Sequence, residues 1–182
     1  GADIINDIWA LRWRADGDGP TGQQVVSTHP NCGVCLMHMH RNPQTMQVAP
    51  MEGDVVPQVL LFLERIAQEL RGLGVDSARI CIDPGIGFGK TVQQNFALLA
   101  HQSSLLSLGY PVLAGWSRKS SLAAVTQRSL SNVATMDARD RLVPSVTAAL
   151  LAVQNGARVV RVHDVKETVQ ALKVFETMQQ CG

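Results

Sequence analysis

Aromatic side chains are scarce in this sequence of 182 residues and make up only 4% of it. The core must therefore come from Val, Leu, Ile, Ala and Met, and a hydrophobic content of 46% is enough for a substantial core in one domain. No apolar run reaches about 18 residues, so we expect no membrane-spanning helix and no membrane partner. The first residues show no signal-peptide pattern, which predicts a cytoplasmic protein.

A surplus of charge is missing as well, since the formal net charge is +1. This near balance argues against a nucleic-acid partner held by bulk electrostatics. Cysteine is limited to four residues, of which Cys32 and Cys35 have the C-x-x-C spacing of zinc and redox sites. The sequence has no second pair of that kind, and Cys35 falls in an apolar run, so we expect reduced structural thiols.

Five apolar runs have the length and composition of buried strands. They cover residues 2–8, 33–39, 79–83, 111–116 and 157–163. Helical patterns follow them at residues 21–28, 54–72, 92–108, 137–155 and 165–180, with a short helix that starts at 117–120 and a polar linker at 126–135. Strands that alternate with helices predict an α/β domain with a parallel sheet. The periodicity alone is compatible with a (β/α)8 barrel or with an open sheet.

Polar side chains gather where these strands end. They are Asn6, Asp83, the stretch 117–120, and the pair Arg161 and His163. In barrels and in open α/β sheets the carboxyl ends of the strands form the ligand-binding edge. Because side chains alternate along a strand, Asp83 shares a face with Cys81, and Arg161 shares a face with His163. The strand ends therefore predict one shared binding site.

The last of these strand ends predicts an anion site. Arg161 and His163 supply cation-capable side chains. Asp164 and Glu167 then form a capping-box pattern that opens a helix. A helix start carries unpaired N–H groups and a partial positive charge. These groups together predict a phosphate-binding site.

The glycine-rich segment after the third strand matches neither common nucleotide-binding motif. A phosphate loop requires glycine where Pro84 stands. The spacing of Gly85, Gly87 and Gly89 does not fit the dinucleotide-binding pattern either. The glycine-flanked Asp83 better suits a carboxylate that accepts paired N–H bonds from a flat heterocycle.

Two other polar groups have ordinary structural interpretations. Ser117-Arg118-Lys119-Ser120 places two cations and two hydroxyls at a helix start, which is equally typical of a capped, solvated terminus. His38 and His40 share a strand face, but no carboxylate stands beside them at ligand spacing. We expect packed histidines there rather than a metal pair.

Taken together, these segments resemble the dihydropteroate synthase family of the folate pathway. The resemblance rests on Ile4-Ile-Asn-Asp-Ile8, Cys35-Leu-Met-His-Met39 with Asn42-Pro-Gln-Thr-Met46, Asp83-Pro-Gly-Ile-Gly-Phe-Gly-Lys90, Gly115-Trp-Ser-Arg-Lys-Ser120 and Arg161-Val-His-Asp-Val-Lys-Glu-Thr168. The family fold is a (β/α)8 TIM barrel, and this sequence is similar to its strands four to eight. We therefore expect a single pterin-binding domain over residues 1–182, an incomplete barrel of about five βα units. We also expect it to be N-terminally truncated and inactive alone.

The resemblance implies a transferase reaction. In it p-aminobenzoate attacks the exocyclic methylene of 6-hydroxymethyl-7,8-dihydropterin diphosphate and gives 7,8-dihydropteroate and diphosphate. The substrate-binding residues implied by position are Asn6, Met37, Asp83, Phe88, Gly115, Lys119, Ser120, Arg161 and His163. Of these, Asn6 and Asp83 would hydrogen-bond the pterin, and Met37 and Phe88 would line its pocket.

The same resemblance assigns the charged groups. Lys119 would contact the pterin and flank the p-aminobenzoate ring, and Ser120 would hold the benzoate carboxylate. Arg161 and His163 would bind the diphosphate, so Lys119, Arg161 and His163 are the implied catalytic residues. Fixed cations suit this chemistry because the leaving group carries the charge.

Magnesium is the implied cofactor, and a homodimer and a sulfonamide target are implied as well. The family's metal-binding Asn belongs to an Asn-Val-Thr-Pro-Asp-Ser-Phe motif that this sequence does not contain, so we expect no metal ligand in this chain. Two alternatives stay open. One is a methyltetrahydrofolate-binding methyltransferase domain, which the diphosphate site disfavours. The other is a non-catalytic pterin-binding fragment, which the missing metal-binding segment supports.

Overall fold

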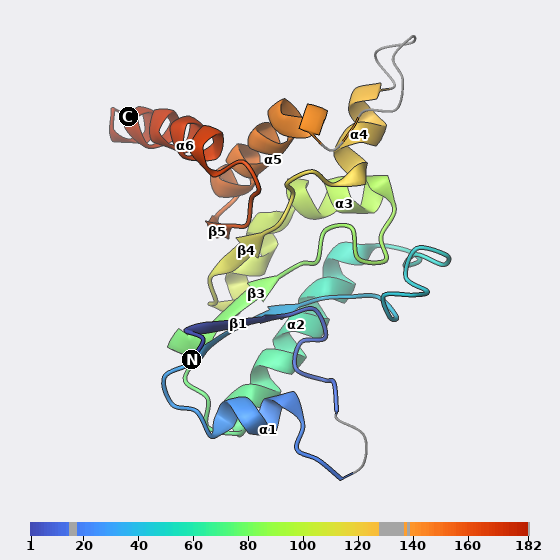
Figure 1. The fold of residues 1–182 in the computed structure, drawn as a ribbon, viewed down its shortest axis with the longest axis vertical. Coiled ribbons are helices and arrows are strands. Elements are labelled where there is room, and N and C mark those ends of the chain that lie inside the picture. Colours follow the sequence, from blue (N-terminus) through green and yellow to red (C-terminus); the bar gives the residue numbers. More distant parts are fainter. Residues whose placement is uncertain (15–17, 128–136, 138, 182) are drawn as a thin grey trace.

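The computed structural model describes residues 1–14, 18–127, 137 and 139–181, and in them five parallel strands form one sheet. The strands are β1 (Ile4–Asp7), β2 (Gly33–Met37), β3 (Ile80–Asp83), β4 (Val112–Ala114) and β5 (Ala157–Val160). They lie in the order β1-β2-β3-β4-β5, so strands that are consecutive in the chain are neighbours in the sheet (Figure 1). A doubly wound open sheet would reverse its order at a switch point, whereas a barrel keeps sequence order. The predicted arc of a (β/α)8 barrel is confirmed.

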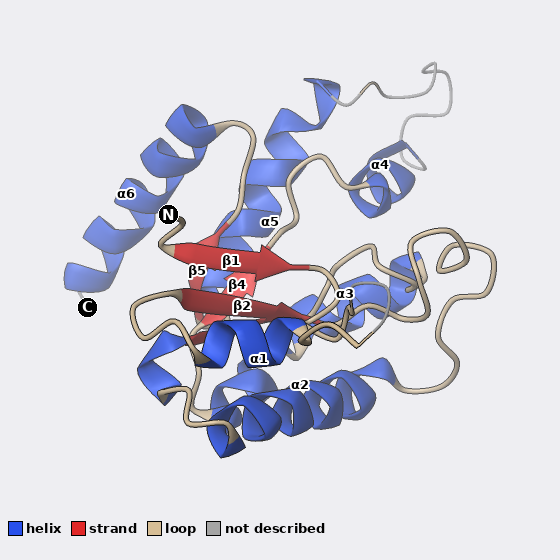
Figure 2. Cartoon of the chain, turned by 60° about the horizontal axis from the view of Figure 1, so that its bottom comes forward, coloured by secondary structure: helices blue, strands red, loops and turns tan. Residues whose placement is uncertain are grey.

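Helices connect the strands and lie around the sheet, as Figure 2 shows. They are α1 (Gly22–Ser27), α2 (Val55–Gly72), α3 (Val92–Ala100), α4 (Ser120–Gln127), α5 (Leu142–Gln154) and α6 (Val165–Gln180). The described residues also form three short 3-10 helices, which are η1 (Ser77–Arg79), η2 (Gln102–Leu108) and η3 (Arg139–Arg141). None of the helices in the described part of the chain is long and apolar enough to cross a membrane.

The longest helix, α2, shows how the sequence builds these elements. Asp54 caps it by accepting a hydrogen bond from the Val56 N–H at 3.0 Å. One apolar stripe at helical spacing is fully buried, and it comprises Val55, Val59, Leu63, Ile66 and Leu70. The stripe packs in the same core as the strand residues Val34, Leu36, Ile80 and Ile82. Burial of this stripe fixes α2 against one face of the sheet.

The opposite face of the sheet carries the polar groups. Cys35 of β2 pairs in register with Cys81 of β3, and Met37 pairs with Asp83 two residues nearer the carboxyl ends. Asn6 of β1 stands in the row of Cys35. The parity predicted from alternation therefore holds, and Asn6, Met37 and Asp83 rise from the same face toward the same edge.

Several predicted boundaries were too generous. The segment 92–108 is not one helix, because α3 ends at Ala100 and η2 follows. Helix α5 begins at Leu142, where Pro144 falls in the first turn and its missing N–H costs no hydrogen bond. Strand β5 ends at Val160, so Arg161 and His163 stand in the loop after it. Helix α4 includes the first two residues of the predicted linker at 126–135, and the rest of that linker lies outside the described residues.

Candidate functional site

A pocket of about 210 Å³ opens at the carboxyl ends of the strands. Its lining residues are Asn6, Ile8, Met37, Asp83, Ile86, Phe88, Gly115, Lys119 and Arg161. All but Ile8 and Ile86 were predicted from the sequence, and every strand or the loop after it contributes to the set. A larger hollow of about 520 Å³ lies at the amino ends beside Gly1, but its ionisable side chains are limited to Asp3 and His29. The smaller pocket is the chemically organised one.

Asp83 is the buried carboxylate of this pocket. It is the last residue of β3 and is 5% exposed, and its Oδ1 accepts the Gly85 N–H at 2.7 Å. Burial raises the pKa of Asp83, while the Gly85 N–H and the nearby cations Lys119, Lys90 and Arg161 act in the opposite direction. Its Oδ2 accepts no hydrogen bond from the described residues. That oxygen, beside Oδ1, suits a ligand with adjacent N–H donors.

The loop after β3 is held from below by Lys90. Lys90 is 5% exposed, and its ammonium donates to the carbonyls of Gly85 at 2.8 Å, Phe88 at 3.2 Å and His38 at 3.4 Å. It also lies 3.0 Å from Nδ1 of His38. Burial lowers the pKa of Lys90 to about 7. Sequence reasoning missed this role, although a lysine directly after three alternating glycines is a usable signal for a cation inside a turn of carbonyls.

The glycines of this loop allow its tight path. Gly85, Gly87 and Gly89 all have positive φ values, of 71°, 82° and 73°. A Cβ on Gly85 would lie 1.8 Å from the carbonyl oxygen of His38. The loop thus packs directly on the end of β2, and it brings Phe88 to the wall of the pocket.

A buried asparagine ties this loop to the next one. Asn95 of α3 is 1% exposed, and its Oδ1 accepts the Gly87 N–H at 2.8 Å. Its Nδ2 donates to Ser121 Oγ at 2.9 Å, in the first turn of α4. Asn95 therefore fixes the distance between the Phe88 loop and the start of α4, and the sequence had not singled it out.

Lys119 is the cation that faces the pocket. Its Nζ lies 4.5 Å from the centroid of the Phe88 ring, a cation–π distance, and it makes no hydrogen bond within the described part of the chain. Burial lowers the pKa of Lys119, Asp83 raises it, and Arg161 lowers it. A Cβ on Gly87 would come within 3.3 Å of its Cδ, so Lys119 lies across that glycine. The ammonium is positioned by packing rather than by acceptors.

Arg161 approaches the same pocket from β5. Its backbone N–H donates to the Ala114 carbonyl at 3.0 Å, which continues the β4–β5 pairing past the end of the strand. Its guanidinium lies over Gly115, where a Cβ would be 3.9 Å from Nε. Arg161 and Lys119 thus bring two cations to the rim of a pocket whose base holds Asp83.

Two predicted site residues do not line this pocket. His163 lies beside it, where its Nδ1 is 2.9 Å from Ser117 Oγ and its backbone N–H donates to the same oxygen at 3.1 Å. Ser120 is exposed at the first position of α4. The prediction that Arg161 and His163 share one face of a strand was wrong, because both stand in the loop after β5, and their joint binding of diphosphate stays a prediction.

The capping-box prediction for Asp164 and Glu167 was wrong. Helix α6 does begin after Asp164, but the Asp164 side chain makes no capping hydrogen bond. Its carboxylate instead pairs with Arg118, whose Nη2 lies 2.7 Å from Oδ1. An arginine brought close by the fold offers two charge-assisted hydrogen bonds, which are stronger than one neutral cap.

The four cysteines are unpaired, and His38 is a packed core residue. Cys32, Cys35, Cys81 and Cys181 are all free thiols, as expected. His38 is 6% exposed and packs edge-on against Phe62, with ring centroids 4.9 Å apart, so the packed-histidine interpretation is confirmed for His38. His40 is only partly buried, and its Nε2 lies 3.3 Å from Arg41 Nε. Within the described ranges no group of three or more His, Cys, Asp or Glu side chains could hold a metal ion.

Several known proteins are similar to this chain in sequence and in fold. The dihydropteroate synthase of Neisseria meningitidis serogroup C is 42% identical over 179 residues, which are 98% of this chain and 59% of that protein. The crystal structure of Burkholderia cenocepacia dihydropteroate synthase complexed with 7,8-dihydropteroate superposes with a TM-score of 0.84 at 46% identity, over 100% of this chain and 62% of the other. The Xanthomonas albilineans dihydropteroate synthase with 4-aminobenzoic acid gives a TM-score of 0.83 at 41% identity, over 98% and 58%.

The chain spans about three fifths of the length of these relatives. The likeness covers nearly all of the chain itself and includes every strand that contributes to the pocket. A family model described as "Pterin binding enzyme" matches residues 1–163, from before β1 to His163. The chain belongs to the pterin-binding enzyme family.

Proposed function

We propose that the protein carrying this chain is a dihydropteroate synthase. It would join p-aminobenzoate to 6-hydroxymethyl-7,8-dihydropterin diphosphate and release 7,8-dihydropteroate and diphosphate. The observation that carries the proposal is the pocket in which Asp83 lies at the base while Lys119 and Arg161 lie at the rim. A base for the heterocycle and a rim for the charged leaving group are what this substrate requires.

The base of the pocket suits the pterin. A pterin presents neighbouring N–H donors at one edge, and the Asp83 carboxylate can accept both of them. Asn6 adds an amide at the end of β1, and Met37 and Phe88 supply the apolar walls against the flat ring. Burial of Asp83 strengthens such hydrogen bonds because the surroundings have a low dielectric.

The rim suits the leaving diphosphate. In the reaction the amine nitrogen of p-aminobenzoate forms a bond to the methylene carbon, the carbon–oxygen bond to diphosphate breaks, and the amine loses a proton. Negative charge grows on the departing oxygen, where Arg161 and His163 would stabilise it. Lys119 lies at the rim against the Phe88 ring, so it can meet the pterin and the benzoate ring together. Ser120, exposed at the start of α4, would receive the benzoate carboxylate.

Magnesium stays a prediction of the resemblance. Mg²⁺ takes oxygen ligands, and the described residues hold no cluster of acidic side chains that could bind it. Asp83, the carboxylate of the pocket, faces Lys119 and Arg161 rather than a second acid. The residues present therefore do not fit a magnesium site. A homodimer, a cytoplasmic location and sulfonamide sensitivity also stay predictions.

The direct test uses the intact protein with the pterin diphosphate and p-aminobenzoate, with 7,8-dihydropteroate as the measured product. Asp83→Asn should abolish pterin binding, because an amide offers only one acceptor to the paired donors. Arg161→Ala should weaken binding of the pterin diphosphate more than binding of the free pterin. Binding without product would favour a non-catalytic module, and methyl transfer from methyltetrahydrofolate would favour a methyltransferase. Equal losses of both ligands in both variants would refute the residue roles.

A further inference from the structure

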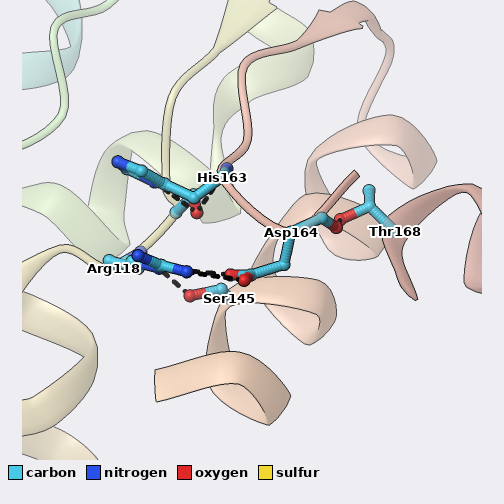
Figure 3. Close-up of polar contacts among 6 residues, drawn as sticks. Arg118, Ser145, His163, Asp164 and Thr168 are labelled. Atoms are coloured by element: carbon cyan, nitrogen blue, oxygen red, sulfur yellow. Dashed lines mark hydrogen bonds and ion pairs between the residues drawn. The ribbon is translucent and has the colours of Figure 1, made fainter. Parts of the chain in front are cut away.

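The loops after β4 and β5 are joined residue by residue. Arg118 and Asp164 form a two-pronged ion pair, with Nη2 2.7 Å from Oδ1 and Nε 3.3 Å from Oδ2. Figure 3 shows the guanidinium turned toward Asp164. The residues just before them, Ser117 and His163, form the second link through the Ser117 hydroxyl. Two adjacent contacts, which we call the serine rung (Ser117–His163) and the arginine rung (Arg118–Asp164), thus connect the loops. Each rung joins residues that are 46 positions apart in the chain.

The backbone of Arg118 adopts a conformation that an arginine does not favour. Its φ is +59°, in the left-handed region, which costs a non-glycine residue roughly 1 kcal/mol. Helix α5 and the segment before it hold that shape, because the Arg118 N–H donates to Ser145 Oγ at 2.9 Å and its carbonyl accepts from Arg141 Nη1 at 2.9 Å. The left-handed turn directs the Arg118 side chain toward Asp164, while the next side chain, Lys119, enters the pocket.

Asp164 is fixed as firmly from its own side. Its carbonyl accepts both the N–H of Thr168, at 3.1 Å, and the Thr168 hydroxyl, at 2.8 Å, in the first turn of α6. Its side chain is 20% exposed and that of Arg118 is 30% exposed. The hydrogen bond from Arg118 lowers the pKa of Asp164. The two ends of the ion pair are therefore anchored to different helices, α5 and α6.

The serine rung bears on the histidine. Nδ1 of His163 lies 2.9 Å from Ser117 Oγ, and the two atoms share a hydrogen bond whichever of them carries the proton. Nε2 is therefore the ring nitrogen that is left to contact an anion. The rung sets which nitrogen of His163 can meet a ligand.

We propose that the Arg118–Asp164 ion pair is a positioning clamp, which holds Lys119 on one loop at a fixed distance from Arg161 and His163 on the other. The inference rests on the proposed function, because it treats Lys119, Arg161 and His163 as the substrate-binding cations. Arg118 itself does not contact substrate, and Asp164 neutralises its charge. Of the two cations in the 117–120 stretch, Lys119 would contact the ligand, and Arg118 would hold the two loops in place.

A double-mutant cycle on the intact protein tests the clamp. The variants are Arg118→Met, Asp164→Asn and the double variant, and the readouts are the dissociation constant of inorganic diphosphate by calorimetry and the kcat and KM of the synthase reaction. We expect each single variant to weaken diphosphate binding and lower kcat by roughly 10- to 100-fold. The double variant should be no worse than either single one, because each change breaks the same clamp. Arg65→Met, which removes an exposed ion pair with Glu69 on α2, is the matched control and should leave both readouts unchanged.

The sign of the Asp164→Asn effect separates the clamp from direct binding. If Arg118 were a diphosphate ligand, Asp164→Asn would remove a neighbouring negative charge and would tighten diphosphate binding. Arg118→Met would then raise the KM for the pterin diphosphate both in the wild-type protein and in the Asp164→Asn variant. That outcome, or additive losses in the double variant, would overturn the clamp. The wild-type turnover decides the proposed function separately, and diphosphate binding reports on the clamp whether or not the protein turns over. Thermal unfolding of each variant checks that the fold persists.

Discussion

Two lysines lie near Asp83, and they differ in what their ammonium groups contact. Lys90 is 5% exposed, and its donors are used by carbonyls of the chain and by His38 Nδ1. Lys119 is half-buried over the Phe88 ring, and within the described residues its ammonium finds no acceptor. Burial lowers the pKa of both. A lowered pKa therefore does not distinguish a structural lysine from a ligand-binding one. The hydrogen bonds of the ammonium do, because Lys90 uses its donors within the chain and Lys119 does not.

The glycines beside the two lysines should give the largest contrast. A Cβ on Gly85 would stand 1.8 Å from the His38 carbonyl oxygen, which is backbone and cannot move aside. A Cβ on Gly87 would meet only the flexible side chain of Lys119, at 3.3 Å. Both positions have positive φ, so the left-handed strain of about 1 kcal/mol is common to both substitutions. We expect Gly85→Ala to abolish folding, as measured by circular dichroism. We expect Gly87→Ala to keep the fold and to lower the turnover of the pterin diphosphate. Similar behaviour of the two would mean that the β3–α3 loop can shift as a unit.

Replacement of Lys90 should cost stability. Lys90→Met removes the ammonium from three groups. The Gly85 and Phe88 carbonyls then keep only the N–H groups of Phe88 and His40, and His38 Nδ1 keeps no partner. Hydrogen bonds from a charged donor contribute about 1.5–3 kcal/mol each, so we expect a loss of about 3 kcal/mol or more in the free energy of unfolding, measured in urea. Lys166→Met, an exposed lysine on α6, is the control and should change stability by less than about 0.5 kcal/mol. A loss below about 1 kcal/mol for Lys90→Met would show that water replaces the ammonium.

The element pattern of this molecule was readable from the sequence for a physical reason. Parallel strands that are buried on both faces need continuous apolar runs, and helices that cover them need one apolar stripe. These two sequence patterns therefore predict α2 and the five strands. Positions such as Asp83 followed because ligands of such sheets bind where strands end. The family resemblance then named the residues around it. Strand ends such as Val160 were misjudged, since pairing continues through single hydrogen bonds past the regular strand.

What could not be predicted depends on contacts between distant segments. Nothing local to Asp164 says that Arg118 will lie beside it, so the capping-box pattern was the natural and wrong interpretation. The same holds for Ser117, whose hydroxyl reaches His163 across 46 residues. The direction in which Arg118 points follows from a left-handed backbone that α5 stabilises, and the sequence carries no glycine there to announce it.

Replacement of Lys119 should lower activity and leave stability nearly unchanged, whereas replacement of Lys90 should mainly lower stability. Lys119→Met removes a cation that no acceptor of the described chain uses, so the free energy of unfolding should change by less than about 1 kcal/mol. Turnover of the pterin diphosphate should fall roughly 100-fold or more, because a fixed charge at the reacting centre is lost. Lys119→Arg keeps the charge but not its compact shape, and it should recover only part of the activity. Large destabilisation with little change in turnover would reverse the assignment of the two lysines.

The smallest expected difference is in the pH dependence of stability. The pKa of Lys90 is about 7 in the folded protein and about 10.4 in an unfolded chain, so between these values the unfolded state binds more protons. Stability should therefore rise with pH, by about 1 kcal/mol between pH 7 and pH 8. His38 acts with the same sign at lower pH, because burial lowers its pKa to about 3 and stability is lost as the pH falls below about 6.5. Urea unfolding at each pH should show the rise above pH 7 in Lys119→Met and a flatter profile in Lys90→Met. An equal slope in both variants would mean that the buried ammonium of Lys90 stays charged throughout, held by the Gly85 and Phe88 carbonyls more strongly than burial opposes it.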